Sequence, residues 1–290
     1  MTCYNAASTI EESVRSVIAQ TFTDWELVLV DDLSNDSSIS IIEKIGEPRL
    51  KIVKLATRHR RTKALNQGFI RCKGTYIAVL DADDIADPSR FQKQVELLDH
   101  RPEIVGVATW FVDVDSERRE ISRTAITTDA KEIKRKFAYE NPLPHSSMMY
   151  RRLPAESVGG YDEDFDYAQD FALWLSLSDL GDYSVVPEYL TQMRKLPSSM
   201  TYGRDYSINS VNDGYRLYRR AQKLDGLRPV DRLRGMRTVG LYGLLYSWRS
   251  LREGSVVRAA GLLIANFWAI PLALFELLRN PRGLGPRKSI

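Results

Sequence analysis

The stretch Thr75-Tyr-Ile-Ala-Val-Leu-Asp81-Ala-Asp83-Asp84 decides the fold, because a strand-like run ends in three carboxylates. The β-branched and aromatic residues before Asp81 predict a buried strand. In a parallel sheet the acidic residues would lie at the carboxyl edge, where open α/β sheets bind ligands. Hard oxygen ligands of this kind suit Mg²⁺ or Mn²⁺, and such an ion suits a diphosphate. The alternative is a polar turn, but turns seldom need so much repelling charge, so we favour a cation site for Asp81 and Asp83.

Helices and strands alternate around this stretch, from residue 1 to about 115. Strands are expected at 26–31, 51–55, 75–80 and 104–111, and helices at about 7–20, 37–45, 62–72 and 88–99. Such alternation predicts βαβ units, and therefore an α/β, Rossmann-like fold with a mainly parallel sheet flanked by helices. Residues 116–200 mix a helix near 129–138, a strand at 146–150 and a helix near 169–179. Met1 to Asn5 resembles the end of a strand and a turn, so most of the first strand is expected to be missing from the sequence.

Composition restricts the class of protein. The 290 residues, 43% hydrophobic and 27% charged, suit one large globular domain or a domain with an appendage. Lys and Arg total 41 against 38 for Asp and Glu, and a net charge of +3 gives no support for nucleic-acid binding. Two cysteines, Cys3 and Cys72, indicate no disulfide framework, which fits a reducing compartment and a cytoplasmic location.

The C-terminal part has a different pattern, since strands stop after about residue 203. Helices are expected at 204–224, 229–251 and 254–279, which gives a helical C-terminal region, 204–290, after a domain of residues 1–203. The last helix contains an uncharged apolar run, 259–275, that is near the short limit for spanning a bilayer and has arginines on both sides. This pattern suits a helix lying on the inner face of an anionic membrane, and it suits equally a helical hairpin packed on the domain.

Six short motifs recur in an order that resembles glycosyltransferase family 2, whose members have the GT-A fold. The motifs are at residues 2–5, 20–22, 26–32, 64–68, 74–84 and 159–162, so the resemblance covers roughly residues 1–200. It implies a metal-dependent, inverting enzyme that moves a sugar from a nucleotide-diphosphate sugar to the hydroxyl of a saccharide or lipid-linked acceptor.

The resemblance also implies a donor site. Thr2, Tyr4 and Asn5 match the family's segment that contacts base and ribose, and the Tyr4 ring could stack on the base. Asp32 matches the carboxylate that accepts a hydrogen bond from the base. A pyrimidine N3–H can supply that bond, so a UDP-sugar is expected. The neighbouring Asp31 is interpreted as a structural residue at the strand end.

Other donor-site residues follow from the family's DxD motif, which Asp81 and Asp83 match. Asp83 would bind the metal, and Asp81 would contact the ribose or a water on the metal, with Asp84 assisting. Arg61 and Lys63 lie where the family often has a cation that contacts phosphate or sugar. For each of these two residues, a solvated helix face is an equal alternative.

On the acceptor side, Asp170 occupies the place of the family's general base, which removes the proton of the attacking hydroxyl. An N-cap role for Asp170 is compatible with this. Gln169 stands where the family usually has Glu, which removes a negative charge beside the base. His145 would face acceptor or diphosphate, although a structural histidine is nearly as well supported.

Arg194 lies near the expected pyrophosphate position. Two residues later the sequence has Leu196 where many members have His, so a third protein ligand for the metal is not expected. Two other functions stay open. A nucleotidyltransferase would need a Gly-rich basic loop after the first strand, which is absent from the sequence there. A non-catalytic nucleotide-sugar-binding module is favoured only by Gln169 and Leu196.

Overall fold

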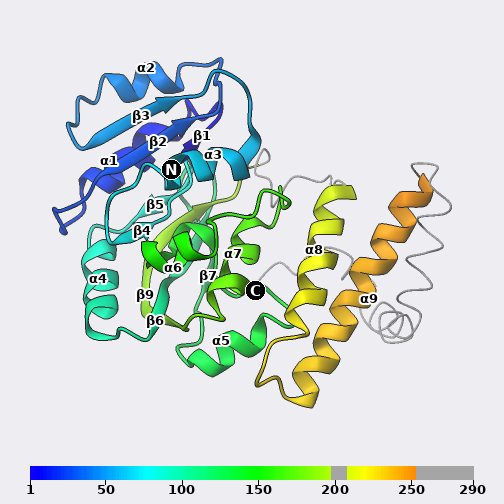
Figure 1. Ribbon diagram of the computed structural model, residues 1–290. Helices are drawn as coiled ribbons and strands as arrows, with labels where there is room; N and C mark the ends of the chain where they lie inside the picture. The colour runs from blue at the N-terminus through cyan, green and yellow to red at the C-terminus, as the bar shows by residue number, and fades with distance from the viewer. Residues whose placement is uncertain (197–207, 253–290) are drawn as a thin grey trace.

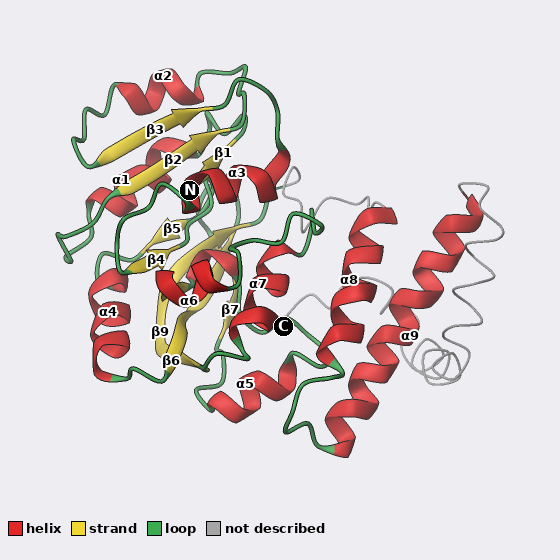
Figure 2. Ribbon diagram, in the orientation of Figure 1, coloured by secondary structure: helices red, strands yellow, loops and turns green. Residues whose placement is uncertain are grey.

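The first of two sheets is small and parallel. The computed structural model describes residues 1–196 and 208–252 (Figures 1 and 2). Strands β1 (Thr2–Cys3), β2 (Leu27–Asp31) and β3 (Leu50–Lys54) are adjacent in chain order and pair in parallel. They are connected by α1 (Ile10–Ile18) and α2 (Ser38–Glu43), and α3 (Arg60–Phe69) follows β3. Every residue of β2 is buried, as its continuous apolar run predicts.

The second sheet is larger and mixed. Its order is β4-β8-β6-β9-β5, with β7 beside β6. The strands are β4 (Tyr76–Ala78), β5 (Ile85–Ala86), β6 (Ile104–Val114), β7 (Glu120–Thr124), β8 (Met149–Arg151) and β9 (Asp182–Arg194). Only β6 and β9 pair in parallel. The α/β class is confirmed, but the expectation of mainly parallel pairing holds only in the first sheet. The reason is that β8 lies between β4 and β6 and runs antiparallel to both.

Helices α4 (Arg90–His100), α5 (Ala130–Lys136), α6 (Arg152–Ser157) and α7 (Gln169–Leu177) accompany the second sheet, with a short 3₁₀ turn at His145–Ser147. The sequence analysis did not predict strand β9, which contains Pro187, a residue that central strands usually exclude. The structure accommodates it with an irregularity: Thr109 pairs with Val186, but the next residue, Trp110, pairs with Tyr189. The local bulge leaves Pro187 outside the ladder.

Helices α8 (Ile208–Ala221) and α9 (Pro229–Arg252) lie side by side at the end of the molecule away from the first sheet (Figure 1). Leu217 and Ala221 of α8 are fully buried in the same apolar core as Trp174 of α7. The packing is therefore continuous here, and a domain boundary near residue 203 stays a prediction. None of the described helices is long and apolar enough to cross a bilayer. The expected helix at 254–279 and its apolar run lie outside the described residues.

A buried polar bridge fixes the end of the decisive strand. Arg90, with no exposed surface, donates from Nη2 to the carbonyls of Val79 (2.9 Å) and Met148 (3.0 Å). Its Nε donates to Gln94, which in turn donates to the carbonyls of Val107 and Ser147. These bonds join the chain after β4 to the segment before β8, and so hold the acidic loop against the 3₁₀ turn.

Candidate active site

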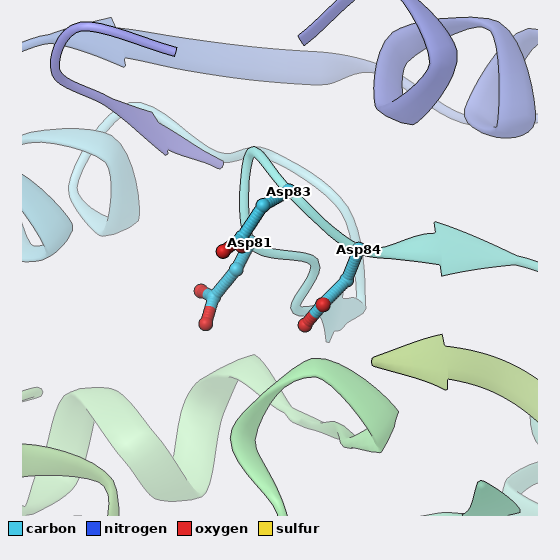
Figure 3. Close-up of side chains that lie close together, drawn as sticks. All are labelled: Asp81, Asp83 and Asp84. Carbon is cyan, nitrogen blue, oxygen red and sulfur yellow. The ribbon is translucent and has the colours of Figure 1, made fainter. Parts of the chain in front are cut away.

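Three carboxylates meet on the loop between β4 and β5. One oxygen from each of Asp81, Asp83 and Asp84 lies within 4.8 Å of the others, and the side chains leave one loop (Figure 3). Burial, and then repulsion by Asp81, raise the pKa of Asp83. Burial, and then repulsion by Asp83, raise the pKa of Asp84 well above its ordinary value. A bound cation would relieve this repulsion, and oxygen ligands fit Mg²⁺ or Mn²⁺, so the residues present fit the expected metal.

Asp81 carries the best-compensated charge of the three. Its Oδ2 accepts from Arg61 Nη2 at 2.6 Å, and its Oδ1 lies 3.1 Å from His145 Nδ1. Burial alone would raise the pKa of Asp81, but Arg61 and then His145 outweigh it and hold that pKa far below the ordinary value. The structure thus brings Arg61, Asp81 and His145 together.

Two tyrosines hold the His145 ring through Nε2, the ring nitrogen that does not face Asp81. Tyr150 OH donates to Tyr161 OH (3.3 Å), which lies 3.0 Å from His145 Nε2. If Tyr161 donates to Nε2, Nδ1 carries the proton and donates to Asp81, and Arg61 Nη2, which lies 3.1 Å from Nδ1, then donates to Asp81 alone. Sequence reasoning placed His145 on the acceptor or diphosphate side. The structure shows it buried against Asp81, and it shows two tyrosines to which the sequence analysis gave no role.

Asp170 lies at the start of α7. The helix begins at Gln169 and its N-cap position is Ala168, so the N-cap interpretation of Asp170 is wrong. The Asp170 carboxylate instead accepts from Phe171 N (2.8 Å) and from Asn141 Nδ2 (3.1 Å), and it is half-buried. Its orientation is therefore set by one backbone and one side-chain donor, and it retains lone pairs for a proton.

The expected nucleoside end forms where β1 and β2 finish. The Asp32 carboxylate accepts from the backbone N–H of His59 (2.6 Å) and Arg60 (3.0 Å), at the N-terminus of α3. It therefore satisfies helix-start donors that lack intrahelical partners. The guanidinium carbon of Arg58 lies 3.2 Å from the centroid of the Tyr4 ring. The sequence analysis missed Arg58, although it is next to the basic run 59–63.

The other residues predicted to lie on the nucleoside side make contacts within the protein that support its fold. Asp31 accepts from Ser34 N, as expected of a strand-end residue. Asn5 has a φ of 49°, and its Oδ1 accepts from Asn35 N at 2.9 Å. Thr2 is paired with Val30 in the first sheet.

The two other expected cations differ in position. Lys63 is more than half exposed, and its Nζ lies 4.0 Å from Glu163, so the structure does not bring it to Asp81. Arg194 is 5% exposed, its backbone N donates to Asp84 Oδ1 at 2.8 Å, and its Nη2 pairs with Glu12 at 2.5 Å. Its buried Nε and Nη1 have no partner within the described part of the chain. Arg194 thus places unsatisfied donors beside the carboxylate cluster.

The family model for glycosyl transferase family 2 matches residues 1–159. The chain belongs to this family. An uncharacterized glycosyltransferase of Haemophilus influenzae is 30% identical over 202 residues, which are 66% of this chain and 62% of that relative. The amylovoran biosynthesis glycosyltransferase AmsE of Erwinia amylovora is 28% identical over 214 residues, 72% of this chain and 79% of that relative. The chain thus spans less than two thirds of the first of these relatives.

Solved structures show the same fold. S. aureus TarS 1–349 in complex with UDP-GlcNAc superposes with a TM-score of 0.68 at 16% identity, covering 98% of this chain and 86% of that one. Mannosyltransferase PcManGT from Pyrobaculum calidifontis, in complex with GDP-Man and Mn²⁺, gives 0.60 at 18% identity, covering 98% and 79%. The predicted GT-A fold and the predicted family are confirmed.

Proposed function

We propose that this protein is a metal-dependent, inverting glycosyltransferase, and that it uses a nucleotide-diphosphate sugar, with UDP-sugars as first choice. The observation that carries the proposal is the mutually repelling cluster of Asp81, Asp83 and Asp84, with Arg61 between Asp81 and the helix that bears Asp170. A cation and a diphosphate together would satisfy charges that the protein leaves unbalanced.

On the donor side, Asp83 and Asp81 would hold Mg²⁺ or Mn²⁺, with Asp84 fixed behind them by Arg194 N. When bound, the ion offsets negative charge on the leaving diphosphate. The Arg194 charge, which acts on Asp83, would attract the same phosphates, and its Nε and Nη1 have no partner within the described structure. His145, held by Tyr161, keeps the Asp81 carboxylate in one orientation.

On the acceptor side, Asp170 would accept the proton of the attacking hydroxyl as the new bond forms. Asn141 and Phe171 N hold its two oxygens, so the base is oriented before the acceptor arrives. With Asp170 acting as the base, the acceptor oxygen would displace the nucleoside diphosphate from the anomeric carbon in one step, and the configuration of that carbon would be inverted.

The donor base would bind near Tyr4 and Asp32. Asp32 uses one lone pair on each oxygen for α3, so a further lone pair can accept from a pyrimidine N3–H. The TarS complex contains UDP-GlcNAc and the archaeal complex contains GDP-Man, so guanosine is the second base to test. Arg58 has to leave the Tyr4 ring, or share it, when a base stacks there.

The acceptor we propose is a saccharide or lipid-linked hydroxyl in the synthesis of a surface polysaccharide or glycolipid. Support comes from relatives named for amylovoran and succinoglycan biosynthesis. Residues 1–203 would form the catalytic domain, and the region 204–290 would bring it to the cytoplasmic face of a membrane through its basic, apolar sequence.

The test is release of nucleoside diphosphate from a panel of UDP- and GDP-sugars, with Mn²⁺ and with EDTA, followed by NMR of the product anomer. We expect activity with one donor, only with metal, and an inverted product. Full activity in EDTA, or retention of configuration, would contradict the proposal. Binding of a donor without transfer or hydrolysis would favour a non-catalytic binding module.

A further inference from the structure

One guanidinium joins the donor carboxylates to the helix that bears the proposed base. Arg61 Nη2 bonds to Asp81 Oδ2 at 2.6 Å, and Arg61 Nε lies 2.8 Å from the side-chain amide of Gln169, to whose oxygen it donates when the amide is oriented by its hydrogen-bond partners. The neighbours fix the orientation of this amide, because its nitrogen then donates to the Asp166 carbonyl at 3.3 Å. Gln169 is 4% exposed and is the first residue of α7.

This arrangement leaves one edge of Arg61 available. Nε and Nη2 are engaged, whereas Nη1 bonds to no residue in the described ranges, and the side chain is 26% exposed. Burial opposes the charge on Arg61, but attraction by Asp81 outweighs it and raises the pKa of Arg61. Arg61 is therefore a charged donor with a fixed orientation and a free nitrogen beside the carboxylate cluster.

The neutral partner matters because of what a carboxylate at the same place would do. Arg61 has one direct ion pair, to Asp81. A glutamate at position 169 would accept the hydrogen bond from Arg61 Nε and form a second ion pair. It would then neutralise the positive charge of Arg61 that would otherwise attract a diphosphate. An amide accepts the same hydrogen bond without adding a charge, so it orients the guanidinium and leaves its charge available.

We propose that Gln169 is a positioning residue that aims the free edge of Arg61 at the donor diphosphate without neutralising it, which makes Arg61 a contact for the leaving group. The inference rests on the proposed nucleotide-diphosphate donor and adds to it a specific anion contact. It also gives a physical role to Gln169, which stands where the family usually has a Glu before the Asp of the proposed base.

The experiment is calorimetric titration of UDP into the full chain, in EDTA and in Mn²⁺. Without metal, Arg61→Gln should weaken UDP binding about tenfold or more, the size of a lost hydrogen bond to a charged group. Gln169→Glu should weaken it in the same direction, since the new carboxylate competes for Arg61. The matched control is Arg71→Gln, which removes an equal charge at an exposed position just after the end of the same helix and should change affinity less than about twofold.

A double-mutant cycle separates this role from a structural one. If Gln169→Glu acts through Arg61, it should have little further effect on UDP affinity in the Arg61→Gln background. Gln169→Glu removes the amide donor of the Asp166 carbonyl but adds a charge that is favourable in the first turn of a helix, so Tm should fall by no more than about 2–4 °C. The Mn²⁺ affinity, measured by electron paramagnetic resonance, should not fall.

Three results would overturn the inference. If the wild type binds UDP but Gln169→Glu binds it equally well, the neutrality of Gln169 has no role, and the proposed function is untouched. If Gln169→Glu weakens binding equally with and without Arg61, the effect is general repulsion and not positioning. If the wild type binds no nucleoside diphosphate even with Mn²⁺, the proposed function fails together with this inference.

Discussion

Asp83→Asn should stabilise the metal-free protein and abolish its response to Mn²⁺. The Asp83 side chain bonds to no other residue in the described structure, so an amide of the same shape costs no visible contact. The substitution removes the negative charge of Asp83. One oxygen of this carboxylate lies within 4.8 Å of an oxygen of Asp81 and of an oxygen of Asp84.

The magnitude follows from Coulomb's law. Two unit charges 4.8 Å apart repel by about 3.5 kcal/mol at an effective dielectric constant of about 20. Arg61 and Arg194 offset part of this repulsion. We therefore expect the free energy of unfolding to rise by about 1–3 kcal/mol at neutral pH, or about 2–4 °C in Tm for each kcal/mol.

The pH dependence has a definite sign. Because the pKa of Asp83 is raised in the folded state, ionisation of Asp83 costs stability as pH rises through that value. The variant should exceed the wild type most at high pH, and the two should converge as pH falls and the carboxylate becomes protonated. Repulsion by Asp83 also helps to raise the pKa of Asp84, so the substitution lowers that pKa too and adds to the difference in the same direction.

The assay is thermal and urea unfolding of both proteins, with EDTA and with Mn²⁺. The wild type should gain about 2.7 kcal/mol at a hundredfold excess over Kd, and Asp83→Asn should gain almost none. Equal stability in EDTA together with an equal gain from Mn²⁺ would refute both the repulsion and the metal assignment.

Three further outcomes are expected. Asp170→Asn should lower turnover about 10²–10⁴-fold with unchanged UDP affinity; near-normal turnover on the true acceptor would remove Asp170 from the mechanism. Arg90→Met should lower the free energy of unfolding by about 2–4 kcal/mol in urea, because the carbonyls of Val79 and Met148 lose their buried donor; unchanged stability would contradict the bridging role. The full chain should sediment with anionic vesicles at low salt and dissociate at high salt; a need for detergent would favour a membrane span, and no binding would favour a packed hairpin.

Local sequence patterns were sufficient for the acidic loop and for most elements of the fold. Asp81 and Asp83 follow directly after a strand-like run, so strand and charges could be identified in one stretch. The direction of strand pairing could not be predicted in this way, because an apolar run predicts a strand but not whether its neighbour is parallel or antiparallel. Strand β9 was also missed. It contains Pro187, and the bulge that accommodates this proline can be identified only from the pairing of β9 with β6.

Contacts between distant segments account for the rest of the site. His145 meets Asp81 from 64 residues away, and Gln169 meets Arg61 from 108 residues away. One signal was available: Gln94 follows Arg90 by four residues on a helix whose Phe91, Val95 and Leu98 are buried. A polar pair on an apolar helix face indicates a buried network, even when its partners cannot be named.

The most direct test of the metal-dependent donor site is the affinity of UDP measured with Mn²⁺ and with EDTA on the same protein. If the carboxylate cluster and the diphosphate share one cation, Mn²⁺ should strengthen UDP binding at least about tenfold, and UDP should strengthen Mn²⁺ binding by the same factor. UDP affinity that is identical in Mn²⁺ and in EDTA would contradict the account.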